Sequence, residues 1–244
     1  PNGAGKTTLF NCLTGFYKPT VGSVRLHHPQ HGPLQLESLE SHEVARFAQV
    51  FGFSEYPSVS DNDGPVNLIV AQHNRLQAAS VFSLAGLLAL PGYREAERRA
   101  VDKAVGWLAR LHLLDKADVP AGALPYGTQR RIEIARALCV DPILLCLDEP
   151  AAGLNPRESA ELNALLQSLA GEQGLAILLI EHDMNVVMNV SEHVCVLNYG
   201  CKIAEGSPAE IQNDEQVIKA YLGEDDEVDA DDESGGEPLP AVAP

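Results

Sequence analysis

The chain is poor in basic residues. Its 17 Lys and Arg stand against 34 Asp and Glu, which gives a formal net charge of −17. Nine of the acids lie between Glu224 and Glu237, where no Lys or Arg occurs. An acidic surface repels phosphate backbones and anionic lipids, so we expect no nucleic acid partner. The acidic, aromatic-free segment 224–244 is predicted to be a disordered, solvating tail rather than a binding motif.

The chain also lacks paired cysteines and long apolar runs. Its five cysteines form no C-x-x-C pair, which favours reduced thiols over a disulfide framework. The longest apolar run, Val81–Leu90, contains Ser83 and Gly86 and falls short of the roughly 20 residues of a membrane span. No signal peptide is recognisable. We expect a soluble chain whose role at a membrane is peripheral.

A phosphate-binding loop is present at the start. The residues Asn2-Gly3-Ala4-Gly5-Lys6-Thr7-Thr8 match G-x-x-x-x-G-K-[ST] from its third position onward, and Pro1 fills the second. Gly3 and Gly5 allow the backbone N–H groups to approach phosphate oxygens, Lys6 supplies a positive charge, and the hydroxyl of Thr7 is a magnesium ligand. A glycine turn that only caps a helix is the alternative, but it has no need of Gly-Lys-Thr-Thr.

Two apolar segments end in chemically active side chains. Ile143–Leu147 precedes Asp148 and Glu149, and Leu175–Ile180 precedes His182. Continuous apolar runs are typical of strands buried in a parallel sheet, whose carboxyl ends bind ligands. Asp148 is therefore a candidate for holding Mg²⁺, and Glu149 for polarising a water. An acidic pair that caps a helix and a structural histidine are the alternatives.

Between the predicted strands lies a helical insert, at about residues 66–138. Helices are predicted over Val66–Ala79, Arg94–Leu113 and Thr128–Leu138 from their apolar spacing. Arg130, Arg131 and Arg136 lie on or near the polar side of the last helix, where we expect a solvated face, with a functional role as the alternative. The fold class is therefore α/β, a P-loop NTPase core with a mainly parallel sheet and an inserted α-helical subdomain.

Two polar features leave alternatives open. His27, His28 and His31 are close enough for a metal site, but the neighbouring Pro and Gly favour a hairpin tip with solvated imidazoles. Gln49 interrupts the apolar segment Phe47–Phe53, which is predicted to be a strand or its exit loop. The glutamine either needs a buried hydrogen-bond partner or faces solvent on an edge strand.

In this order, the motifs resemble those of ATP-binding cassette (ABC) ATPases, and in detail those of the ATPase subunits of bacterial branched-chain amino-acid importers. Supporting stretches include Val70–His73, Leu90–Arg94, Leu124–Gly127 and Ala220–Gly223. The resemblance covers about residues 1–223, which we expect to form one ATPase domain. It also implies that the leading strands, the first glycine of the loop and an adenine-stacking aromatic residue belong before Pro1.

The resemblance implies roles for individual residues. Asp148 corresponds to the Mg²⁺ aspartate, Glu149 to the catalytic base and His182 to the switch histidine at the γ-phosphate. Gln49 corresponds to the glutamine that touches Mg²⁺ and senses the transporter. The segment with Leu124, Tyr126 and Gly127 corresponds to the signature motif presented to ATP on the other subunit, although Pro125 and Thr128 depart from Leu-Ser-Gly-Gly-Gln. Asn155 lies in the loop that crosses the dimer interface.

Two functions follow as hypotheses. The first is an importer ATPase, with ATP and Mg²⁺ bound at the cytoplasmic face of the inner membrane. Its partners would be a second ATPase subunit, identical or not, transmembrane permease subunits and, indirectly, a solute-binding protein. The second is a soluble or regulatory cassette uncoupled from transport, or one serving another solute. No N-K-x-D motif occurs, which argues against a GTPase.

Overall fold

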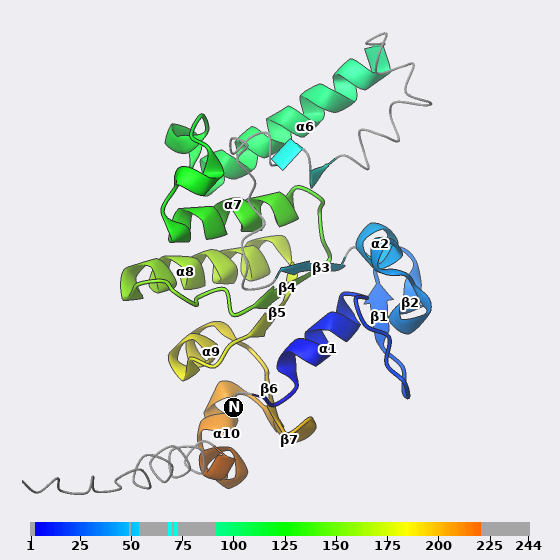
Figure 1. Cartoon of the computed structure of the whole chain (residues 1–244), viewed down its shortest axis with the longest axis vertical. Helices are drawn as coiled ribbons and strands as arrows, with labels where there is room; N and C mark the ends of the chain where they lie inside the picture. The colour runs from blue at the N-terminus through cyan, green and yellow to red at the C-terminus, as the bar shows by residue number, and fades with distance from the viewer. Residues whose placement is uncertain (1–2, 49, 54–67, 70, 73–90, 221–244) are drawn as a thin grey trace, which may run out of the picture. The chain divides into compact units, whose positions relative to one another are not determined.

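The computed structural model describes residues 3–48, 50–53, 68–69, 71–72 and 91–220 (Figure 1). The chain divides into two compact units, residues 7–181 and residues 1–6 together with 182–244. Each unit is described by itself. Within the described ranges, no helix combines the length and apolar character needed to cross a membrane.

A parallel sheet lies at the centre of the larger unit. Its strands β3 (Val50–Phe53), β4 (Leu144–Asp148) and β5 (Ala176–Ile180) run in the order β3-β4-β5. The register pairs Phe53 with Leu147 and Asp148 with Ile180. The middle strand is buried from Leu145 to Asp148, and successive side chains of a strand point to opposite faces of the sheet, so both faces are covered at this strand, which explains its apolar sequence. The two strands predicted at 143–147 and 175–180 are confirmed.

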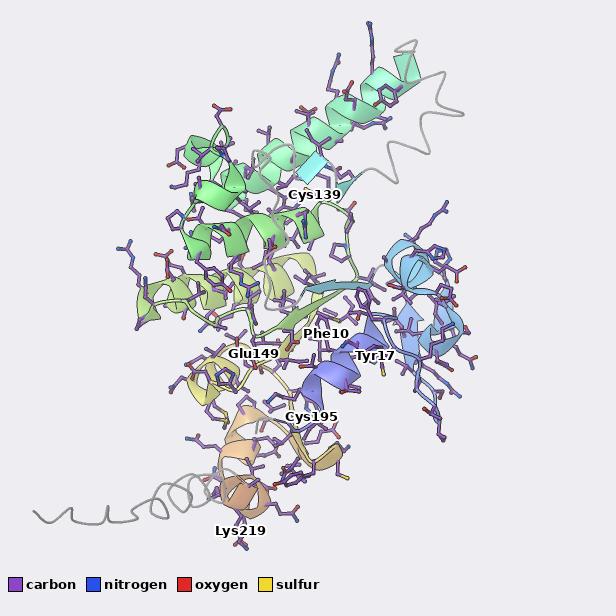
Figure 2. The ribbon with its side chains drawn as sticks, in the orientation of Figure 1. Phe10, Tyr17, Cys139, Glu149, Cys195 and Lys219 are labelled. Atoms are coloured by element: carbon purple, nitrogen blue, oxygen red, sulfur yellow. The ribbon has the colours of Figure 1, made fainter. Side chains whose placement is uncertain are left out.

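Helix α1 (Lys6–Leu13) contributes to the core of this sheet. Phe10, labelled in Figure 2, is buried with Val50, Cys146 and Ile180, one residue from each strand. Burial also raises the pKa of the Cys146 thiol to about 12, so that this cysteine stays protonated near neutral pH. A buried, protonated thiol is a poor nucleophile.

A hairpin follows α1. Strands β1 (Arg25–His28) and β2 (Gly32–Gln35) are antiparallel, as the Pro and Gly around the histidines predict. His28 is buried, however, and its Nδ1 accepts the backbone N–H groups of Gln30 and His31 at 3.0 and 3.2 Å. The prediction of a solvated imidazole was therefore wrong for His28, because its ring accepts hydrogen bonds from the backbone N–H groups of the turn. Short helical turns continue the chain at Leu36–Ser38 (η1), Ser41–Glu43 (α2) and Val44–Ala48 (η2).

The helical part of the larger unit contains α6 (Pro91–Arg110) and α7 (Tyr126–Leu138), joined by turns η3 (Leu114–Lys116) and η4 (Ala121–Ala123). The two helices lie next to each other in Figure 1 and share a buried core. Ala104, Leu108 and Ile132 belong to that core, which confirms the predicted apolar stripes. Of the helix expected at 66–79, residues 68, 69 and 71 are described and are helical.

Arg130 contradicts the prediction of a solvated arginine face on α7. Its side chain is 1% exposed and lies beside Glu133, which is equally buried. Arg131 is partly exposed and pairs with Glu161 of helix α8 (Pro156–Gln173). The error has a physical cause: helical spacing alone cannot tell which side of a charged helix a neighbouring helix will cover.

The smaller unit contains helix α9 (Met184–Val190), the hairpin of β6 (Val194–Asn198) and β7 (Cys201–Gly206), and helix α10 (Pro208–Gln212). Residues 215–220 are also helical. Val194, Val196, Ile211 and Val217 form its core. The turn at Tyr199 and Gly200 has the left-handed backbone that closes such hairpins, with φ values of 47° and 78°.

Candidate nucleotide site

The phosphate loop has the backbone that its glycines predict. Gly3 and Gly5 have φ values of 71° and 88°, which residues with a Cβ rarely adopt, and α1 begins directly afterwards at Lys6. The loop is braced within the smaller unit, where the N–H of Gly200 donates to the carbonyl oxygen of Ala4 at 3.0 Å. This hydrogen bond was not predicted from the sequence. The residues Tyr199-Gly200 indicate a turn, but they do not indicate which distant segment the turn contacts.

The acidic pair lies at the carboxyl end of β4. Asp148 is 6% exposed, whereas Glu149 is half-buried and has a left-handed backbone with φ 46° (Figure 2). The N–H of Glu149 donates to the carbonyl oxygen of Ile180 at 2.9 Å. This bond continues the β4–β5 ladder by one residue while the chain turns away. Asp148 therefore ends the strand, and Glu149 begins the loop that follows it.

Glu181 supports the loop that follows Glu149. Its side chain is 9% exposed, and Oε1 accepts the N–H of Ala151 at 3.0 Å. A carboxylate that accepts a backbone N–H fixes the path of that backbone. No role was predicted for Glu181 from the sequence. Its position beside His182, at the end of a predicted strand, was the feature that could have indicated one.

The loop then enters α8 through a complete cap. Asn155 Oδ1 accepts the N–H groups of Arg157 and Glu158 at 3.1 and 3.0 Å, and Glu158 Oε2 accepts the N–H of Asn155 at 3.0 Å. This reciprocal capping box, with Pro156 in the first turn, defines the start of α8. Asn155 is exposed, so its position is fixed by its own helix.

The segment Leu124–Thr128 begins helix α7. Leu124 is buried, and its carbonyl oxygen accepts the side-chain N–H of Gln129 at 2.8 Å. Gly127 is buried against α8, where an added Cβ would lie 2.8 Å from Glu158 Oε1. A residue larger than glycine would displace that carboxylate, which also caps α8, so the site favours glycine.

The other residues predicted for the site are exposed or lie outside the described ranges. His182 is exposed in the smaller unit, next to Asp183, which caps α9 by accepting the N–H of Asn185 at 2.8 Å. Thr7 and Thr8 are exposed in the first turns of α1. Asn2 and Gln49 lie outside the described residues. The structure thus brings together Glu149, Glu181 and the signature segment within the larger unit, and Gly3–Lys6 with the β6–β7 turn within the smaller one.

Two family models match the sequence of this chain. The ABC transporter model matches residues 1–152, and a model described as a branched-chain amino acid ATP-binding cassette transporter matches residues 201–227. The chain belongs to the ABC transporter family, as an ATP-hydrolysing cassette. The fold class expected from the sequence is confirmed.

Individual proteins similar to this chain include branched-chain amino acid transport proteins and a solved ATP-binding cassette. The chain is 46% identical over 224 residues to the high-affinity branched-chain amino acid transport ATP-binding protein BraF of Pseudomonas aeruginosa, covering 92% of this chain and 85% of that protein. It is 48% identical, with the same coverage, to LivG of Escherichia coli, which has the same description. Among solved structures, MJ1267, an ATP-binding cassette of an ABC transporter in its ADP conformation, matches with a TM-score of 0.73 and 26% identity, over 91% of this chain and 85% of that one.

Proposed function

We propose that the chain is the ATP-hydrolysing subunit of an importer for branched-chain or related amino acids. The observation that carries this proposal is the identity of 46% to BraF and 48% to LivG across 92% of the chain. The second family model supports the same solute class from a separate region, residues 201–227. An ATPase subunit transmits energy and does not touch the solute, so the site residues themselves carry no solute specificity.

Within this function, Glu149 orients and polarises the water that attacks the γ-phosphate. The left-handed turn and the bond to Ile180 hold its backbone at the end of β4, which limits the reorganisation needed during the reaction. Lys6 and the loop N–H groups bind phosphate oxygens, and His182 contacts the γ-phosphate. No covalent intermediate is required, because phosphoryl transfer depends on positioning and charge stabilisation.

The residues fit a magnesium nucleotide. A carboxylate at the carboxyl end of a parallel strand, held 6% exposed, and a hydroxyl in the first turn of α1 are the donors that magnesium prefers. Asp148 and Thr7 would hold the ion, with Gln49 from outside the described residues. When bound, magnesium would neutralise charge on the phosphates.

The partners follow from the same proposal. The signature segment, Leu124–Thr128, serves ATP held mainly by a second cassette, and Asn155 contributes to the same interface. Permease subunits anchor the complex, so that the chain lies at the cytoplasmic face of the inner membrane as a peripheral subunit. A solute-binding protein acts on the chain only through the permease.

The test is co-purification with the permease subunits, followed by reconstitution in lipid with the solute-binding protein. We expect ATP hydrolysis to rise when leucine, isoleucine or valine is supplied, and to remain basal with a phosphonate. Stimulation by a different solute class, or hydrolysis indifferent to every solute, would contradict the proposed function.

A further inference from the structure

The first turn of α7 packs directly on the segment that follows Glu149. A Cβ added to Gly153 would lie 3.4 Å from Cε1 of Tyr126, so the tyrosine ring rests against that glycine backbone. One residue further along, Gly127 meets the carboxylate of Glu158 in the first turn of α8. The signature segment and the segment 149–158 are therefore in contact at two successive positions, with small residues allowing the close approach.

Arg130 supports this contact from inside the unit. Its guanidinium carbon lies 5.0 Å from the centre of the Tyr126 ring, within the range of a cation–π interaction. Its Nη1 lies 3.5 Å from Oε2 of Glu133, and both side chains are 1% exposed. A guanidinium can stack on a ring and pair with a carboxylate at the same time, which an ammonium group does less well.

A buried ion pair of this kind is weak evidence of a contribution to stability. Apolar residues of similar volume often replace buried ion pairs without loss of stability. A charged pair that fixes the orientation of a neighbouring ring instead provides a defined geometry. Tyr126 is the ring in question, and it touches both the buried arginine and the loop of the catalytic glutamate.

We propose that Arg130 is a positioning residue that fixes Tyr126 against Gly153 and so joins the signature segment and the Glu149 loop into one rigid body. The inference rests on the proposed function, in which Glu149 serves the chain's own ATP and the signature segment serves ATP on the partner cassette. Arg130 of one cassette then affects hydrolysis at both ATP sites, although it is too buried to touch either nucleotide.

The test is Arg130→Lys in one cassette of the assembled transporter, with differently tagged copies if the two cassettes are identical. Two backgrounds isolate the sites. Glu149→Gln in this chain leaves hydrolysis to the partner's site, and the corresponding glutamate-to-glutamine change in the partner leaves it to this chain's site. We expect single-turnover hydrolysis to fall roughly three- to tenfold at both sites, which is the range of a lost cation–π contact.

Arg110→Lys is the matched control, because Arg110 makes the same type of contact with the Trp107 ring at 5.5 Å on α6, away from the catalytic loop. We expect it to leave both rates unchanged. ATP affinity should also be unchanged in Arg130→Lys, whereas a general loss of structure would lower it. A rate loss confined to the partner's site would overturn the proposal, as would unchanged rates at both.

A second variant approaches the contact from the other side. Gly153→Ala adds a methyl group against the Tyr126 ring at a residue with φ 74°, and we expect it to slow both sites as well. If Arg130→Lys does not fold, Gly153→Ala tests the proposal instead. A slower rate at this chain's own site alone would overturn the proposal. Failure of the proposed function is distinguishable, since it would abolish solute stimulation and leave the two-site rate effect measurable.

Discussion

Glu149 donates its backbone N–H to the carbonyl oxygen of Ile180 at 2.9 Å, with its own φ at 46°. This hydrogen bond ties the loop that begins at Glu149 to the end of β5, one residue before the buried carboxylate of Glu181. The same short region thus combines a strained backbone, a ladder hydrogen bond and a side-chain acceptor for Ala151. Local strain of this kind is typical of functional sites, where surrounding contacts hold it in place.

Glu149→Gln should retain ATP binding and slow hydrolysis about a hundredfold or more, the usual contribution of a positioned general base. The amide keeps the size of the side chain but cannot accept a proton. Steady-state hydrolysis and equilibrium nucleotide binding measure the two effects separately. Glu192→Gln, at an exposed position, is the control and should hydrolyse at the unmodified rate. Near-normal turnover of Glu149→Gln would remove this residue from the mechanism.

Glu149→Gly should be more stable than Glu149→Ala by about 1 kcal/mol, and we expect both variants to be inactive. A Cβ is disfavoured at φ 46°, and glycine relieves that strain. Denaturant unfolding of the two variants measures the difference. Ala160→Gly, in the exposed interior of α8, should instead lose stability by about 1 kcal/mol relative to the parent chain. If alanine is the better residue at both positions, the left-handed turn is not present in solution.

Glu181→Ala should destabilise the larger unit by about 1–3 kcal/mol, because the N–H of Ala151 loses its buried acceptor. Glu181→Gln keeps an acceptor oxygen and should lose less. Unfolding in urea gives the free energies, and hydrogen exchange at Ala151 reports the bond itself. Equal losses in the two variants would mean that the carboxylate charge, rather than the bond to Ala151, is what matters.

Gln49→Ala should leave ATP binding nearly unchanged while reducing transport and transporter-stimulated hydrolysis. The residue lies outside the described positions, so this expectation comes from the sequence, which places it at the junction between the nucleotide core and the helical insert. A contact made only when magnesium nucleotide is present can shift a conformational equilibrium. Reconstituted vesicles allow solute uptake and ATP hydrolysis to be measured together. Wild-type turnover and uptake per ATP would exclude Gln49 as the coupling residue.

Strands, helices and the order of the motifs could be predicted from the sequence, because each depends on residues that are close together in the chain. The apolar run Leu144–Leu147 predicts a buried strand, and Asn155-Pro156 predicts the start of α8. The glycines of the phosphate loop are likewise determined locally, since only a positive φ brings the chain into α1 after so short a turn.

Burial and long-range partners were decided only by the tertiary structure. Arg130 and His28 are polar residues that the sequence placed in solvent, and both are buried in the structure. The bonds from Gly200 to Ala4 and from Ala151 to Glu181 join residues far apart in the chain. Propensity and spacing act over a few residues, whereas the environment of a charged or hydrogen-bonding side chain depends on which distant element packs against it.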